Sequence, residues 1–128
     1  HLDLTTEARG LELGHPTFPG IFAQRGALRV LETIGLEQIE ARIAELTVYL
    51  FERMDVLGIA ILSPRKVGRR AGITMLGVPD PVGTARGLKK KNVSVSARGE
   101  GIRVALHFYN NRRDVDRLAE ALEGVLKD

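Results

Sequence analysis

A long apolar stripe between residues 36 and 57 constrains the fold of this chain more than any other feature. Seven apolar side chains recur there every three or four residues, with Glu and Arg between them: Leu36, Ile39, Ile43, Leu46, Leu50, Met54 and Leu57. This spacing is typical of an amphipathic helix, and the Gly58 that follows is a typical helix end. Such a helix must bury its apolar face against a second layer.

Short strands further along the chain predict that second layer. The apolar runs at residues 59–62 and 73–78 indicate two strands. Residues 93–96 and 102–106 alternate between polar and apolar, and the turn expected over residues 97–101 would join them as a hairpin. We therefore expect a small, mostly antiparallel sheet.

Three further helices are expected around this sheet. The first spans residues 21–34, and the second starts at Asp80 as N-cap with Pro81 in the first turn and Val82, Ala85 and Leu88 inward. The last follows Asn110 or Asn111. The resulting order predicts an α+β fold with its helices packed on one face of the sheet.

Composition narrows the class of protein. The 128 residues are enough for one domain, and 44% hydrophobic residues are too many for a disordered chain. The absence of cysteine excludes disulfides, thiolate metal sites and a cysteine nucleophile in this chain. No apolar run could span a bilayer and no signal-peptide pattern is present, so we expect a cytoplasmic protein without a membrane partner.

Polar motifs in the chain are few. The three histidines lie far apart in sequence, so no metal site is predicted. The net charge of +3 comes from basic clusters at residues 65–70, 89–91 and 112–113. We interpret these clusters as solvated surface rather than a nucleic-acid footprint.

Arg103 is the one residue whose position suggests chemistry. Alternation along its strand places it on the face opposite Ile102 and Val104, away from the predicted helices. A guanidinium there could clamp a carboxylate, because its fork matches two oxygens. The spacing alone favours the plainer alternative, an ordinary solvated or ion-paired arginine.

Two segments of the chain together resemble one family. The run Val95-Ser-Ala-Arg98-Gly-Glu-Gly-Ile-Arg103-Val-Ala-Leu-His107-Phe-Tyr-Asn110 and the earlier Leu13-Gly-His-Pro-Thr-Phe-Pro-Gly20 resemble signatures of class V aminotransferases, in the same order. This family includes cysteine desulfurases, selenocysteine lyases and isopenicillin N epimerase-like enzymes, and it uses pyridoxal phosphate. The resemblance implies the small C-terminal domain of the type I aminotransferase fold.

The resemblance also implies a domain organisation. We expect residues 21–128 to be the small α+β domain and residues 1–20 to be a linker from a large domain that this sequence does not contain. The first residue, His1 rather than Met, fits the expectation of a piece of a longer protein. Family members pair as homodimers, so the implied partners are the large domain and a second subunit.

Specific residues acquire roles through the same resemblance. Arg103 matches the arginine that binds the carboxylate of the amino-acid substrate, and Arg98 is a second candidate. Gly14, His15 and Thr17 are candidates for binding the cofactor phosphate of the neighbouring subunit. His15 stands where many members have threonine, which is a departure from the family pattern.

The family's remaining catalytic groups are not expected in this chain. The resemblance assigns the Schiff-base lysine to the large domain, so we expect no catalytic residue here and no activity from the chain alone. Because the chain has no cysteine, a cysteine desulfurase of the usual kind is disfavoured. Arg112 and Arg113 oppose the dipole of the last helix. Such charges can mark a local partner or an anionic contact, but we favour the plainer alternative that they are tolerated surface residues.

Two hypotheses therefore stand. In the first, the chain is part of a pyridoxal-phosphate enzyme that transaminates an amino acid, epimerises it or eliminates a group from it. In the second, it is a stand-alone α+β module that binds a ligand or RNA without catalysis.

Overall fold

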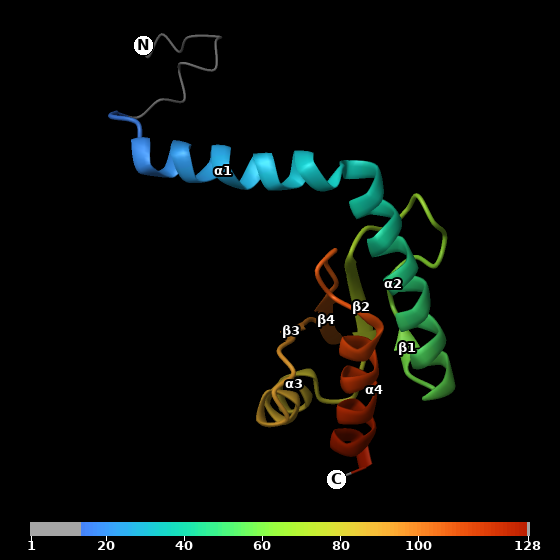
Figure 1. The fold of residues 1–128 in the computed structure, drawn as a ribbon. Helices are drawn as coiled ribbons and strands as arrows, with labels where there is room; N and C mark the ends of the chain where they lie inside the picture. Colours follow the sequence, from blue (N-terminus) through green and yellow to red (C-terminus); the bar gives the residue numbers. More distant parts are fainter. Residues whose placement is uncertain (1–13, 128) are drawn as a thin grey trace, which may run out of the picture. The chain divides into compact units, whose positions relative to one another are not determined.

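The computed structural model describes residues 14–127, which form two compact units divided between Leu36 and Glu37. The first unit contains helix α1 (Phe18–Ile34), and the second contains the sheet and the other helices (Figure 1). Most of the predicted linker, including Leu13 of the family motif, lies outside the described residues.

Helix α1 begins at Phe18, three residues earlier than predicted. Pro19 lies in its first turn, where a missing N–H breaks no helical hydrogen bond. At the other end, the N–H of Gly35 donates to the carbonyl of Leu31 at 2.9 Å. The helix buries none of its residues, so its predicted apolar stripe is not covered within the described part of the first unit.

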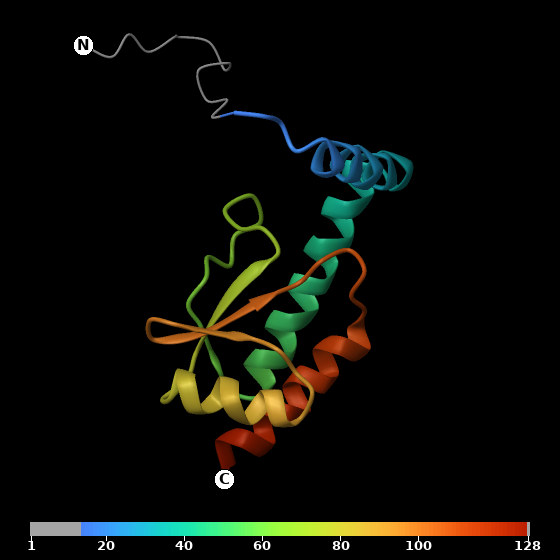
Figure 2. The ribbon, with the colours of Figure 1, turned by 90° about the vertical axis from the view of Figure 1, so that its left-hand side faces the viewer.

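The second unit has the predicted order of elements. Its four strands are antiparallel and lie in the order β1-β2-β4-β3. Their bounds are β1 Ala60–Ile61, β2 Ile73–Gly77, β3 Ser96–Arg98 and β4 Gly101–Ala105. The helices are α2 (Leu36–Val56), α3 (Pro81–Lys90) and α4 (Arg112–Lys127), and Figure 2 shows them gathered on one side of the sheet. The α+β fold class is confirmed.

The core lies between this sheet and the helices. Leu76 of β2 and Ile102 of β4 are directly paired and both fully buried, with Val104 beside them. Against them pack buried residues of α2 and α4: Leu46, Leu50, Met54, Val115, Leu118 and Leu122. The stripe predicted on the long helix is thus buried from Leu46 to Met54.

The hairpin forms, but its first strand lies later than predicted. Residues 93–95 belong to no strand, because Asn92 adopts a left-handed φ of 60° and the N–H of Val93 still donates to the carbonyl of Leu88 at the end of α3. Strand β3 therefore starts only at Ser96. The turn shrinks from the five residues expected to Gly99 and Glu100, with Gly99 at a φ of 51° that favours glycine.

Helix α3 starts at the predicted cap but buries a different face. Asp80 Oδ1 accepts a hydrogen bond from the Gly83 N–H at 2.9 Å. Val82, which we expected to point inward, is 59% exposed, whereas Thr84 is buried together with Leu88 one turn later. The prediction for Val82 was wrong because the inward positions follow the spacing from Thr84 to Leu88.

One buried hydroxyl yields a stability prediction. Thr74 Oγ1 is buried and has no hydrogen-bond partner within residues 14–127. We expect Thr74→Val to raise the free energy of unfolding by about 1 kcal/mol, because an unsatisfied buried hydroxyl is costly. Chemical denaturation of the 128-residue chain measures this change.

Thr47 supplies the matched control. It is equally buried, but its hydroxyl donates to the Ile43 carbonyl at 2.7 Å. Thr47→Val should therefore give no gain in stability. Equal losses for the two variants would contradict the account of Thr74.

Candidate functional site

Arg103 lies in the middle of β4, between its paired residues Met75 of β2 and Ser96 of β3. Its strand neighbours Ile102 and Val104 are buried in the core, so the arginine side chain belongs to the opposite face of the sheet. It is half-buried there. The predicted side of the sheet is therefore correct.

Arg98 lies on the same face. It ends β3, where it pairs with Gly101, and the neighbouring pair Ala97 and Ile102 faces the core. Arg98 and Arg103 are thus diagonal neighbours on adjacent strands. Arg98 is exposed, and neither arginine forms an ion pair with another described residue.

We call this side of the sheet, away from α2, α3 and α4, the open face. Its basic half lies on β3 and β4 and its apolar half on β1 and β2, where Ile73 is 53% exposed. Leu62, just after β1, lies over Gly77 and Gly101, since a Cβ at either glycine would come within 3.4 Å of its side chain. Exposed apolar area next to unpaired charge is typical of a surface that contacts something else.

The candidate phosphate ligands belong to the first unit. Gly14, His15 and Thr17 are all exposed, and the His15 ring meets the Phe18 ring edge-on at 6.0 Å. Thr17 occupies the N-cap position of α1, but its side chain makes no capping hydrogen bond, and the first turn holds no acidic residue. The hydroxyl and the first N–H groups of α1 are therefore available to an anion.

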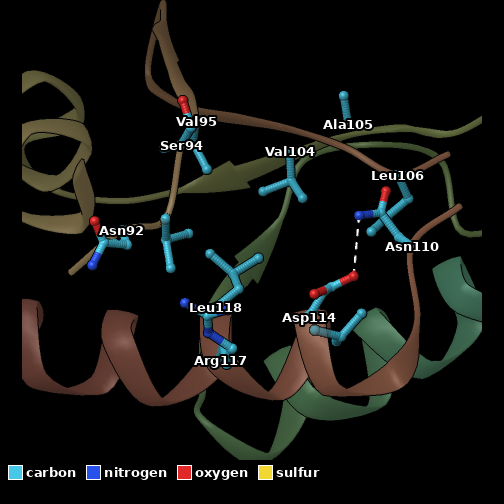
Figure 3. Close-up of a pocket in the computed structure, with 12 residues that line it drawn as sticks. Asn92, Ser94, Val95, Val104, Ala105, Leu106, Asn110, Asp114, Arg117 and Leu118 are labelled. Carbon is cyan, nitrogen blue, oxygen red and sulfur yellow. Dashed lines mark hydrogen bonds between the residues drawn. The ribbon is translucent and has the colours of Figure 1, made fainter.

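A cavity of about 210 Å³ lies elsewhere, between α4 and β4 (Figure 3). Val104, Leu106 and Leu118 line it, so it is on the helix side of the sheet. None of the predicted site residues lines it. Figure 3 shows the Asn110 and Asp114 side chains pointing toward each other at its rim, joined by a 3.2 Å hydrogen bond.

These rim residues fix the start of α4. Asn111 Oδ1 accepts from the Asp114 N–H at 3.2 Å, and Asp114 Oδ2 accepts from the Asn111 N–H at 3.0 Å. This reciprocal pair is a capping box, and Asn110 supports it by accepting from the His107 N–H at 3.0 Å. Hydrogen bonds from Asn111 and Asn110 lower the pKa of Asp114 below its usual 3.8.

Arg112 has a partner inside the chain. It forms an ion pair with Glu45 of α2 at 3.0 Å and lies over the Tyr49 ring at 5.0 Å. Glu45 also binds Arg42, which donates to the Asn110 carbonyl at 3.1 Å. Hydrogen bonds from Arg42 and Arg112 hold the pKa of Glu45 below its usual value.

Arg112 is an exposed residue, as expected, and its ion pair with Glu45 agrees with the alternative that it marks a partner. Its partner lies 67 residues away, and no local pattern links the two positions. What the sequence did offer was the unusual placement of a positive charge at the start of a helix.

Some arginines of the basic cluster at residues 65–70 also have partners within the chain. Arg65 pairs with Asp55, and the Arg70 guanidinium lies 4.5 Å from the centre of the Phe51 ring. These contacts join the loop between β1 and β2 to α2. Among residues 14–127, no group of three or more His, Cys, Asp or Glu side chains could hold a metal ion. No described helix is long and apolar enough to cross a membrane.

The chain belongs to the class V aminotransferase family, whose model matches residues 2–118. A protein of Staphylococcus aureus named probable cysteine desulfurase is 31% identical over 137 aligned residues, covering 94% of this chain and 32% of that protein. An uncharacterized aminotransferase of Schizosaccharomyces pombe is 34% identical over 101 residues, covering 77% of this chain and 25% of that protein.

Solved structures agree with this assignment. The apo cysteine desulfurase of Thermococcus onnurineus superposes with a TM-score of 0.85 at 25% identity, covering 96% of this chain and 34% of that one. An alanine–glyoxylate aminotransferase of Nostoc superposes with a TM-score of 0.71 at 27% identity, covering 94% of this chain and 34% of that one. The chain thus spans between a quarter and about a third of the length of these relatives.

The capping box yields a prediction on acid stability. Because the pKa of folded Asp114 lies below 3.8, its charged form contributes stability that is complete above this value and is lost as the pH falls below it. Asp114→Asn should lower stability at neutral pH and flatten the decline between about pH 5 and pH 2.5. Urea unfolding of both chains across this range measures the effect.

Glu120→Gln is the control. Glu120 is exposed on the same helix and takes part in no ion pair with a described residue. This variant should keep the acid dependence of the parent chain. An Asp114→Asn chain whose stability falls as steeply as the parent's would contradict the capping role.

Proposed function

We propose that this chain is the substrate-carboxylate-binding part of a pyridoxal-phosphate-dependent enzyme that acts on an amino acid. The observation that carries this proposal is Arg103, half-buried in the centre of a sheet face and without an ion-pair partner in the described chain. A half-buried guanidinium is stabilised by an anion. Family membership favours the carboxylate of an amino acid as that anion.

Arg103 would bind and orient the substrate. Its planar fork donates two parallel hydrogen bonds to a carboxylate, which fixes the direction as well as the position of the amino acid. The strand supports this role, since both neighbours of Arg103 are anchored in the core. A rigid anchor of this kind holds the α-carbon in one place while the reaction occurs.

Gly14, His15 and Thr17 would hold the phosphate of the cofactor. Their fit rests on the free hydroxyl and N–H groups at the start of α1 and on the absence of an acidic residue in its first turn. When bound, pyridoxal phosphate supplies an electron sink for the bonds at the α-carbon. In the family this phosphate contact reaches the neighbouring subunit, so we infer a homodimer.

We infer that the chain alone is inactive. Its five lysines are Lys66, Lys89, Lys90, Lys91 and Lys127, and all of them are exposed at loops or helix ends. The reaction type, whether transamination, epimerisation or elimination, belongs to groups of the large domain. We also propose a cytoplasmic enzyme without nucleic-acid or membrane partners; the β2 positions on the open face, Ile73 and Met75, offer no aromatic ring for base stacking.

The role of Arg103 is tested in the full-length holoenzyme. Arg103→Ala should lower kcat/KM for every amino-acid substrate by about 10- to 100-fold, since a charged hydrogen-bond partner of the carboxylate is lost. Steady-state kinetics measures the change. Arg86→Ala, at an exposed arginine of α3, is the control and should leave kcat/KM unchanged. An Arg103→Ala enzyme with unaltered kinetics would refute the proposal.

The inactivity of the chain alone is tested by trapping. The 128-residue chain is mixed with pyridoxal phosphate and reduced with borohydride, which fixes any lysine bound to the cofactor. We expect no stoichiometric label at any single lysine, because none is buried against a cofactor site. Full labelling of one lysine, detected by peptide mass spectrometry, would overturn this inference.

A further inference from the structure

We propose that the substrate is an acidic amino acid, with its side-chain carboxylate bound by Arg98 while Arg103 holds the α-carboxylate. This inference rests on the proposed function, because it assumes that Arg103 binds the substrate. It adds the chemical class of the side chain, which that function leaves open.

The register of the hairpin brings the two arginines together on the open face. Ser96 pairs with Arg103 and Arg98 pairs with Gly101, which makes the two arginines diagonal neighbours on one face. Diagonal neighbours lie about 7–8 Å apart across adjacent strands. Two arginine side chains starting at that distance can reach the two ends of one small molecule. The carboxylates of aspartate and glutamate are joined by only two or three carbons.

The open face carries positive charge on β3 and β4. Side chains on strands β2, β3 and β4 of this face are those of Ile73, Met75, Ser96, Arg98, Arg103 and Ala105. None of them is acidic, and neither guanidinium has an ion-pair partner among residues 14–127. Two neighbouring positive charges repel each other until anions neutralise them. A dicarboxylate supplies both anions at once.

The turn of the hairpin follows directly after Arg98. The turn after it has only two residues, and Gly99 adopts the positive φ that such a turn favours. Gly101, opposite Arg98, has no side chain, and a Cβ there would collide with the Leu76 carbonyl. Gly101 therefore places no side chain of its own between Arg98 and Arg103, and the Leu62 side chain that lies over Gly101 is apolar and brings no charge that would compete for Arg98.

Glutamate and glutamine form the matched probe, because they differ in side-chain charge and hardly in size. Each amino acid is titrated into the full-length holoenzyme, and its binding is monitored by the absorbance of the cofactor. For the amino acids that react, kcat/KM is measured as well. We expect tighter binding of glutamate than of glutamine. Arg98→Ala should reduce this preference about tenfold and leave the affinity for glutamine unchanged. Aspartate and asparagine are a second matched pair, which tests a site that fits a side chain one carbon shorter.

The controls separate this inference from the proposed function. Arg103→Ala should weaken the binding of both amino acids of a pair equally. If it does not, the result counts against the proposed function itself. Arg86→Ala should change neither. If Arg103→Ala acts as expected but Arg98→Ala leaves both preferences intact, or if the parent enzyme prefers the neutral amino acids, the acidic substrate is refuted. Weaker pyridoxal-phosphate binding by Arg98→Ala with unchanged preferences would make Arg98 a cofactor ligand and also overturn the inference.

Discussion

The burial of one face of the sheet by α2 and α4 is the constraint on which the rest of the second unit depends. Leu76, Ile102 and Val104 fill the core from the sheet side, and their alternation leaves every second residue of β2 and β4 on the other face. Arg103 lies on that other face because Ile102 and Val104, its neighbours along the strand, are buried in the core and side chains alternate between the two faces. Because its two neighbours are packed in the core, the backbone of Arg103, the candidate substrate anchor, is held in place by that packing.

A second set of interactions fixes the connection that leaves β4. The capping box of Asn111 and Asp114 starts α4, and the ion pair between Arg112 and Glu45 joins that start to α2. Two of the helices that cover the sheet, α2 and α4, are thus joined at the end where β4 exits. The side chains of Arg112 and Glu45 are 61% and 43% exposed, so their ion pair defines the direction of the loop more than it adds to stability.

The sequence carried enough information for the order of elements and for the face of Arg103, since both follow from local periodicity. It was misleading at residues 93–95, which alternate like a strand but belong to the segment that connects α3 to β3, because Asn92 closes the helix directly before them. It could not indicate the pairing of Arg112 with Glu45, which depends on how two helices pack. The candidate cofactor ligands depended on resemblance alone, because Gly14, His15 and Thr17 form no pattern with a physical meaning of its own.

The central claim is that the open face binds the carboxylate of an amino acid through Arg103. A crystal structure of the full-length holoenzyme with an unreactive amino-acid analogue tests it most directly. The account predicts two carboxylate oxygens at about 2.7–2.9 Å from the guanidinium nitrogens of Arg103. An Arg103 paired with a carboxylate of the protein, with the analogue bound elsewhere, would contradict it.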